Sequence, residues 1–320
     1  MQFSTCSLFP FFPQVKLSVV STLYRSEDNL EEYYARLSDA LAQTTEDHEI
    51  ILVDDGSPDD SLAKALELQR LDNRIRVVEL SRNFGHHPAI MAGFQHVQGE
   101  RVFVIDSDLE EHPALLVEFW KEMEADPDKD VVYGYQTKRR GGWFEKISGH
   151  VFYFLLNLST GMKLQPNQVT ARLMTKEYVQ ALLQHRERNL FLAGLCQVAG
   201  YNQHGIAVSK QHKGHTSYSL LKKMALCLTA FTSFTGVPLV AMFFVGVVVS
   251  MFSFGLSLYF IYMALFESTV IPSWIAIMTS IWFIGGVLMS FIGITGLYID
   301  KIYQEVKARP LFLVKKVHET

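Results

Sequence analysis

Two acidic residues follow an apolar run in segment 102–108, whose sequence is VFVIDSD. The apolar run predicts a strand that is covered on both faces, as in a parallel sheet. Asp106 and Asp108 would then lie just past its carboxyl end, where open α/β sheets bind ligands. Because two neighbouring carboxylates repel each other without a cation between them, the pair favours Mg²⁺ or Mn²⁺ bridging to a diphosphate. The alternative is a solvated acidic turn.

A second acidic strand end is predicted at Asp54 and Asp55, which follow the apolar run 49–53. Carboxylates there can accept hydrogen bonds from a ribose or from a base N–H, and Gly56 allows a tight turn. The alternative is a helix N-cap, in which Ser57 or Asp59 binds free backbone N–H groups. Two acidic strand ends in one α/β unit favour a nucleotide site.

Glycine-rich phosphate loops are absent from the sequence, which contains neither G-x-G-x-x-G nor G-x-x-x-x-G-K-[ST]. Neither a dinucleotide fold nor a P-loop is therefore supported. Diphosphate binding would depend on a metal ion and on basic side chains. The adjacent His86 and His87 are better explained as loop or cap residues than as metal ligands, because consecutive residues rarely point at one ion.

Strand-like and helix-like segments alternate from residue 15 to about 215, which is typical of an α/β layered domain. Strands are predicted at 17–23, 49–53, 76–80, 102–105 and 130–135. Helices are predicted at 29–43, 61–70, 88–97, from after Pro113 to 124, and 143–158. The acidic pairs would thus lie at one edge of a sheet. We expect a catalytic domain over 15–216, preceded by a flexible leader at 1–14.

The C-terminal third is strongly apolar, because residues 224–266 and 268–299 contain no charged side chain. Each run exceeds the roughly 20 residues that span a bilayer, so we expect two transmembrane helices within 236–299. Basic residues precede and follow the pair, whereas the connecting loop has none. The positive-inside rule then places both termini and the catalytic domain in the cytoplasm, with 300–320 as a cytoplasmic tail.

Segment 217–235 begins with basic residues and mixes apolar with hydroxyl side chains, so it predicts an amphipathic helix at the membrane surface. An extension of the first transmembrane helix is the alternative. The three cysteines are scattered, which suits a reducing cytoplasm. A net charge of −4 argues against nucleic acid as a partner. Gly285, Gly286 and Gly293 could let the hairpin pack against copies of itself as a homo-oligomer.

Several short motifs occur in a fixed order along the chain. They are SVVSTLY from Ser18, VDDGSPDDS from Val53, LSRNFG from Leu80, DSDL from Asp106, Pro166-Asn167, Arg172-Leu-Met174, Gly214, Ser217-Tyr-Ser219 and the segment from Tyr298 to Leu311. Together with the two predicted spans, this order resembles the family 2 inverting glycosyltransferases with a GT-A fold. It is similar to the polyisoprenyl-phosphate branch, which includes dolichyl-phosphate mannose synthase and bacterial undecaprenyl-phosphate sugar transferases.

The resemblance implies a role for each matched residue. Asp54 and Asp55 would hold the base and ribose of a nucleotide-sugar, while Asp106 and Asp108 would hold the metal and the donor diphosphate. The implied phosphate contacts are Arg82, Arg172 and Lys213, since fixed cations stabilise charge on a leaving diphosphate. Ser217 and Tyr218 match the motif near the acceptor phosphate. Catalysis would centre on Asp108 and Arg172, with assistance from Glu110 or Glu111.

Three departures from the family pattern bear on specificity. Leu109-Glu-Glu-His-Pro113 replaces the frequent Leu-Gln-Asp-Pro-Pro, Thr170 replaces an Asp, and Ser217 replaces a basic residue. These changes leave the sugar and the phosphate ligands open, but they do not affect the Asp-x-Asp pair.

The resemblance implies an integral protein of a bacterial inner membrane. It would transfer a sugar, with inversion, from a UDP-, GDP- or dTDP-linked donor to undecaprenyl or dolichyl phosphate. A phosphate monoester is already ionised near neutral pH, so the need for a strong general base is reduced. The alternative function is a catalytically silent membrane subunit that binds nucleotide-sugar or scaffolds a glycolipid flippase.

Overall fold

The computed structural model describes residues 15–136, 167–185, 192–208 and 273–319, with six isolated positions between 245 and 266. The chain divides into two compact units. The first contains a sheet domain together with residues 310–319, and the second contains the long helix α10 (Ser273–Val306). The predicted leader, the helix at 143–158 and the amphipathic helix at 217–235 lie outside the described residues.

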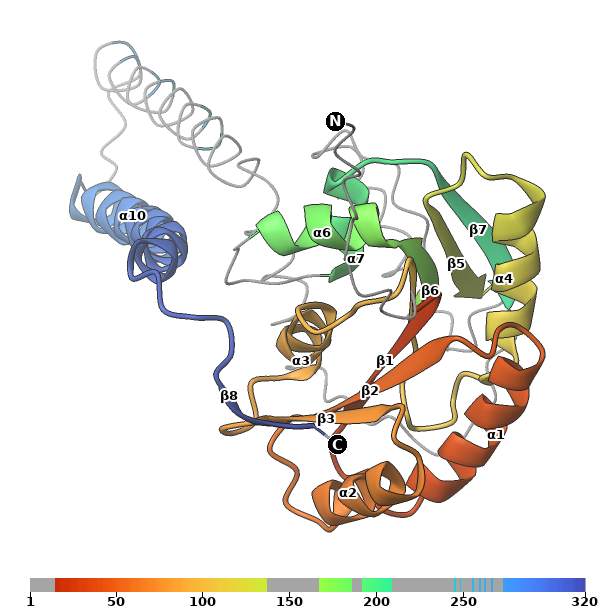
Figure 1. The fold of residues 1–320 in the computed structure, drawn as a ribbon. Helices are drawn as coiled ribbons and strands as arrows, with labels where there is room; N and C mark the ends of the chain where they lie inside the picture. Colours follow the sequence, from red (N-terminus) through yellow and green to blue (C-terminus); the bar gives the residue numbers. More distant parts are fainter. Residues whose placement is uncertain are drawn as a thin grey trace, which may run out of the picture. The chain divides into compact units, whose positions relative to one another are not determined.

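A mixed sheet of eight strands forms the first unit, in the order β7-β5-β6-β4-β1-β2-β3-β8 (Figure 1). The strands are β1 (Leu17–Leu23), β2 (His48–Asp54), β3 (Ile75–Leu80), β4 (Arg101–Val104), β5 (Val131–Gln136), β6 (Gln168–Thr175), β7 (Gln203–Val208) and β8 (Val314–His318). Strands β4, β1, β2 and β3 are parallel, whereas β6 is antiparallel to β4 and β8 is antiparallel to β3. The strand order reverses between β1 and β4, where such sheets bind ligands at the carboxyl ends.

Helices cover both faces of this sheet (Figure 1). On one face lie α1 (Leu30–Ala42), α2 (Ser61–Leu71) and α4 (Leu115–Ala125), and on the other lie α3 (His86–Phe94), α6 (Lys176–Gln184) and α7 (Leu192–Val198). Alternate strand residues feed the two cores, so Val19 packs with α1 while Val20 packs with α3. All seven residues of β2 are buried, which explains its continuous apolar run.

The five predicted strands are confirmed by β1 to β5, each to within one residue at either end. The helices at 29–43, 61–70 and 114–124 are confirmed as α1, α2 and α4, with similar small shifts. Helix α3 begins at His86, two residues before the predicted start, and ends three residues before the predicted end. The earlier start matters because it places His86 on the helix rather than in a loop.

Three strands were not predicted, namely β6, β7 and β8. Strand β6 contains Arg172 and two threonines, so its sequence shows no simple alternation, yet it pairs with both β4 and β5. Strand β8 has the sequence VKKVH and lies at the edge of the sheet, where lysines are common because they prevent further pairing.

The segment predicted as a C-terminal tail is therefore largely ordered structure. Helix α10 continues to Val306, and β8 extends the catalytic sheet beyond β3. The Nζ atom of Lys315 lies 2.6 Å from Glu79 Oε1, and His318 Nε2 lies 3.1 Å from Glu79 Oε2. These contacts fix the end of the chain to the third parallel strand, so residues 314–318 belong to the sheet domain.

Helix α10 covers the position of the second predicted span, whereas most of the first lies outside the described residues. Within the ranges that the structure describes, no helix is both long enough and apolar enough to cross a membrane. The pair of spans is not confirmed and stays a prediction.

Candidate functional site

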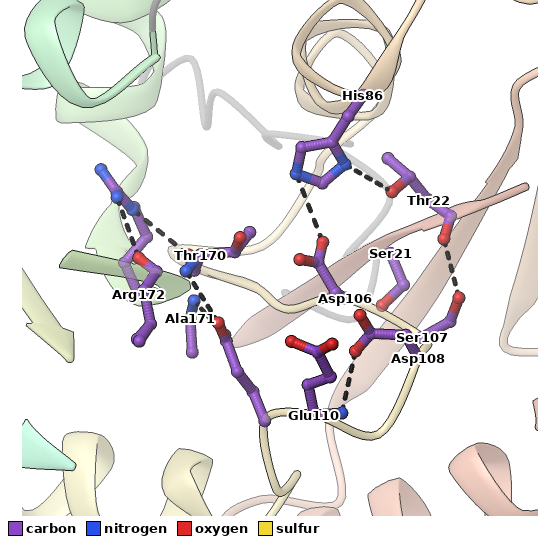
Figure 2. Close-up of polar contacts among 12 residues, drawn as sticks. Ser21, Thr22, His86, Asp106, Ser107, Asp108, Glu110, Thr170, Ala171 and Arg172 are labelled. Atoms are coloured by element: carbon purple, nitrogen blue, oxygen red, sulfur yellow. Dashed lines mark hydrogen bonds and ion pairs between the residues drawn. The ribbon is translucent and has the colours of Figure 1, made fainter. Parts of the chain in front are cut away.

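The loop that follows β4 carries three acidic side chains toward the carboxyl edge of the sheet (Figure 2). Its residues alternate: Ser107 and Leu109 are buried, whereas Asp106 and Glu110 are partly exposed and Asp108 is exposed. The Ser107 hydroxyl donates to the Thr22 carbonyl oxygen at 2.9 Å, which ties the loop to the end of β1. The predicted pair Asp106 and Asp108 thus lies at the switch point of the sheet.

Backbone geometry in this loop is unusual at Leu109, which has a φ of 62° and a buried side chain. A left-handed conformation costs a non-glycine residue of the order of 1–2 kcal/mol, so burial of the leucine must hold it in place. The Asp108 carboxylate accepts a hydrogen bond from the Glu110 backbone N–H at 2.9 Å. The turn therefore fixes the relative positions of Asp108 and Glu110.

Glu110 and Glu111 have different surroundings, which separates the two candidates for assistance in catalysis. Glu111 is 2% exposed, and its carboxylate accepts from the backbone N–H groups of Thr170 at 3.0 Å and Ala171 at 2.7 Å. It thereby joins the acidic loop to β6. Glu110 is partly exposed and follows Asp108 closely, so it is the glutamate that could reach a substrate.

His86 lies at the same edge, between the ends of two strands (Figure 2). Its Nε2 atom is 3.4 Å from Asp106 Oδ1, and its Nδ1 atom is 3.1 Å from Thr22 Oγ1. The sequence pointed to neither contact, since Thr22 is 64 positions away.

The acidic pair at the end of β2 is buried, with Asp54 and Asp55 each 2% exposed. Burial raises the pKa of Asp54 to about 6, and the nearby Glu79 carboxylate adds to the effect, while hydrogen bonds from the Ser57 and Gly56 N–H groups oppose it. Burial also raises the pKa of Asp55, against hydrogen bonds from Phe84 and Gly85.

Both carboxylate oxygens of Asp55 bind backbone. Oδ1 accepts from the Phe84 N–H at 2.7 Å and Oδ2 accepts from the Gly85 N–H at 2.9 Å. Gly56 has a φ of 62°, and a Cβ there would lie 2.5 Å from the Arg82 carbonyl carbon, so the turn after β2 requires glycine. The predicted tight turn is confirmed, and Asp55 positions the loop that leads into α3.

The N-cap alternative, which named Ser57 or Asp59, is met only in part, because the N-cap of α2 is Asp60 and Asp59 precedes it. The Asp59 Oδ1 atom accepts from the Ser61 N–H at 3.3 Å and from the Ser61 hydroxyl at 2.7 Å. Burial alone would raise the pKa of Asp59, but hydrogen bonds from the Ser57 and Ser61 hydroxyls lower it to about 2. Asp59 is thus an ionised residue that supports the start of α2.

Arg82 and Arg172 differ in exposure. Arg82 is exposed, with its guanidinium carbon 4.1 Å from the centre of the Phe84 ring. Arg172 is 4% exposed and donates to the Thr170 and Val169 carbonyl oxygens at 3.3 Å and to Cys196 Sγ at 2.7 Å. In Figure 2 its guanidinium lies apart from Asp108, on the far side of β6 residues 170–171. Lys213, Ser217 and Tyr218 lie outside the described residues.

A divalent cation is chemically compatible with the acidic loop. In the part of the chain that the structure describes, no group of three or more His, Cys, Asp or Glu side chains is arranged to hold a metal ion. Mg²⁺, however, is usually held by one or two carboxylates together with substrate phosphates and water. Asp106 and Asp108 provide such a donor set at the ligand-binding edge, so the residues fit an ion whose coordination a diphosphate completes.

Comparisons with known proteins show the family to which the chain belongs. The family model described as "Glycosyl transferase family 2" matches residues 18–183. A relative from Mycobacterium tuberculosis with a glycosyltransferase name is 40% identical over 95% of this chain and 89% of its own length. An uncharacterized glycosyltransferase from Synechocystis is 34% identical over 94% of this chain and 95% of its own.

Similarity to solved structures is weaker. Glucosyl-3-phosphoglycerate synthase from Mycobacterium tuberculosis, solved with UDP, is 20% identical and gives a TM-score of 0.45. The match covers 68% of this chain and 78% of that one.

Proposed function

The chain belongs to glycosyl transferase family 2, and on that premise we propose that it transfers a sugar from a nucleotide-diphosphate donor to a polyprenyl phosphate at a membrane surface. It is a glycosyltransferase with the α/β fold and mixed sheet of the GT-A class. The observation that carries the proposal is the position of Asp106 and Asp108, on one loop beside the switch point between β1 and β4.

The two acidic strand ends would hold different parts of the donor. The Asp54 carboxylate accepts from the Ser57 and Gly56 N–H groups, and its two oxygens have further lone pairs that can accept a hydrogen bond from a base or ribose. Asp55 acts indirectly, by holding the loop at 84–85. The diphosphate would lie at the acidic loop, and the exposed Arg82 is a candidate partner for its charge.

The chemical step follows from the acceptor's charge. An oxygen of the acceptor phosphate attacks the anomeric carbon, the bond from that carbon to the donor diphosphate breaks, and the configuration inverts. A bound divalent cation would neutralise charge on the departing diphosphate. The attacking phosphate is already ionised near neutral pH, so Glu110 would accept hydrogen bonds from the bound sugar rather than remove a proton from the acceptor. Glu111 is excluded from that role because both its oxygens bind β6.

A lipid acceptor is supported by the distribution of apolar side chains. The two charge-free runs at 224–266 and 268–299 suit membrane insertion with a cytoplasmic catalytic domain. On α10, large apolar side chains are exposed at Trp274, Ile277, Ile281, Ile284, Leu288 and Ile292. Contiguous exposed apolar surface of this kind marks contact with a membrane or a partner. We propose that α10 contacts lipid in a bacterial inner membrane.

The test is sugar transfer by the full-length protein in detergent. Undecaprenyl phosphate and Mn²⁺ are combined with a panel of UDP-, GDP- and dTDP-sugars, and the lipid products are separated. A glycolipid formed from one donor, and abolished both by EDTA and by Asp108→Asn, is the expected result. Asp60→Asn is the matched control, because Asp60 is exposed and its side chain makes no cap hydrogen bond to α2.

Two negative results of this assay would have different meanings. Transfer to a soluble acceptor but not to the lipid would contradict the polyprenyl phosphate and leave the glycosyltransferase intact. Binding of a nucleotide-sugar without transfer to any acceptor would favour the alternative, a catalytically silent membrane subunit.

A further inference from the structure

His86 connects the two strands between which the sheet order reverses. Thr22 is the penultimate residue of β1, and Asp106 follows β4, with the imidazole of His86 between them (Figure 2). The distances are 3.1 Å from Nδ1 to Thr22 Oγ1 and 3.4 Å from Nε2 to Asp106 Oδ1. Although His86 is exposed, its two ring nitrogens thus contact both strand ends at the ligand-binding edge.

The Asp55 carboxylate fixes the backbone that leads into His86. Gly85 has a φ of 100°, which lets the chain turn sharply into α3, and the Asp55 carboxylate binds the N–H groups of Phe84 and Gly85. The buried core then contains Ala89 and Ile90 on the first turns of the helix. Buried structure therefore fixes the backbone that carries the imidazole, although the ring itself is exposed.

The two ring nitrogens have different partners, and this defines what the ring can do. In a neutral imidazole, a proton on Nε2 faces Asp106 Oδ1 at 3.4 Å, slightly beyond ordinary hydrogen-bond length, and Nδ1 can accept from the Thr22 hydroxyl. With both nitrogens engaged, the ring is not itself available to a metal ion. It can, however, fix the orientation of the Asp106 carboxylate, as hydrogen-bonding partners commonly do for ligating carboxylates.

We propose that His86 is a positioning residue for Asp106: it holds one carboxylate oxygen through Nε2, so that the other oxygen faces the divalent cation. Thr22 fixes the ring from the opposite side. This inference rests on the proposed function, because it assumes that Asp106 and Asp108 hold the cation. Loss of such a partner typically weakens metal binding by roughly 10- to 100-fold.

The test measures metal binding directly. The full-length protein in detergent is titrated with Mn²⁺, first alone and then with UDP or GDP added, and free Mn²⁺ is followed by its electron paramagnetic resonance signal. We expect His86→Ala to weaken Mn²⁺ binding by at least about 10-fold. His86→Gln, whose amide can still donate to Asp106, should recover most of the affinity, and Thr22→Val should have a smaller effect than His86→Ala. His96→Ala is the control, since His96 contacts the Ala92 carbonyl past the other end of α3.

The outcomes separate this inference from the proposed function. If the unaltered protein binds no Mn²⁺, or if Asp108→Asn binds as well as the unaltered protein, the metal site itself is wrong. If Asp108→Asn abolishes binding while His86→Ala binds normally or more tightly, only the role of His86 is wrong. An equal loss in His86→Gln and His86→Ala, with normal thermal unfolding, would also overturn it, because the donated hydrogen bond would then be irrelevant.

Discussion

Two strand ends of this protein carry paired carboxylates, and their surroundings are opposite. At the end of β2, Asp54 and Asp55 are each 2% exposed, and Asp55 binds two backbone N–H groups. At the end of β4, Asp108 is exposed and Asp106 is partly exposed, with contacts to a loop N–H and to an imidazole. We call them the closed pair and the open pair.

The difference shows that similar acidic motifs at one sheet edge can have separate tasks. Carboxylates that accept backbone hydrogen bonds in a buried position stabilise the loops around a site. Carboxylates that face solvent keep lone pairs for a cation and for substrate. Substitutions in the open pair should therefore affect activity, and substitutions in the closed pair should affect folding.

The largest effect is expected for Asp108→Asn in the open pair. Because we propose that Asp108 holds the cation, its loss should lower kcat/KM by about 1000-fold or more, since metal ions contribute several kcal/mol of transition-state stabilisation. The free energy of unfolding should change by less than about 0.5 kcal/mol, because the side chain is exposed. Steady-state transfer kinetics and chemical denaturation in detergent measure the two quantities. A large loss of stability would show that the open pair is structural.

In the closed pair, Asp55→Ala should have the opposite profile. It leaves the buried N–H groups of Phe84 and Gly85 without their acceptor, at a cost of about 3 kcal/mol of unfolding free energy. Those residues lead into α3 and His86, so activity should also fall. The decrease should be smaller than in Asp108→Asn, because it comes only from displacement of the loop. Asp60→Asn in the same turn should be neutral. Equal stability of Asp55→Ala and the unaltered protein would mean that the contrast between the pairs is false.

The pH dependence of stability tests the burial of the closed pair without breaking the contacts of Asp55 with its loop. The pKa of Asp54 is raised by burial to about 6, so the folded state favours its protonated form. The associated stabilisation is fully present below the unfolded pKa near 4 and is lost as the pH rises through about 6. Relative to Asp54→Asn, the unaltered protein should lose on the order of 2 kcal/mol between pH 4 and pH 7.

Denaturation of both proteins at several pH values measures this difference. Parallel stability profiles would contradict the raised pKa. A donor KM that increases as the pH falls through about 6 would further indicate that ionised Asp54 accepts a hydrogen bond from the nucleotide.

The sequence predicts the positions of both pairs, but not the contrast between them. Apolar runs before Asp54 and Asp106 are sufficient to place each pair at a strand end. Whether a carboxylate is closed depends on which loop folds over it, and the partners of Asp55 are 29 and 30 positions away. The choice between Glu110 and Glu111 likewise depends on β6, some 60 positions later.

Two of the three unpredicted strands, β6 and β8, were missed for a related reason. In β6, a buried arginine satisfied by carbonyl oxygens and Cys196 breaks the alternation that identifies a strand. In β8, lysines suit an edge position but resemble a polar tail. His86 was missed because its contacts are with residues 64 and 20 positions away, so adjacency to His87 was the only visible feature.

Glu111→Gln tests how strongly the loop that carries the open pair depends on the buried Glu111 carboxylate, which attaches that loop to β6. The amide keeps one acceptor oxygen but turns an NH₂ group toward a backbone N–H, so the free energy of unfolding should fall by about 1 kcal/mol. We also expect a lower kcat, because the acidic loop loses part of its attachment to β6. Glu110→Gln, which removes no contact to β6, should reduce kcat with unchanged stability. If Glu111→Gln is as stable as Glu110→Gln and the unaltered protein, Glu111 does not anchor the loop.

The smallest effect is expected at Arg82, whose backbone is near the closed pair but whose side chain is exposed, like the open pair. Its backbone lies in the loop that Asp55 holds, while its exposed guanidinium packs on Phe84 within 4.1 Å of the ring centre. Arg82→Gln should lower the free energy of unfolding by only about 0.5 kcal/mol, the value of an exposed cation–π contact. If the guanidinium also meets the donor diphosphate, the donor KM should increase while the acceptor KM does not. A change in stability without a change in donor KM would show that Arg82 only stabilises the loop held by Asp55, through its packing on Phe84, and does not bind the donor.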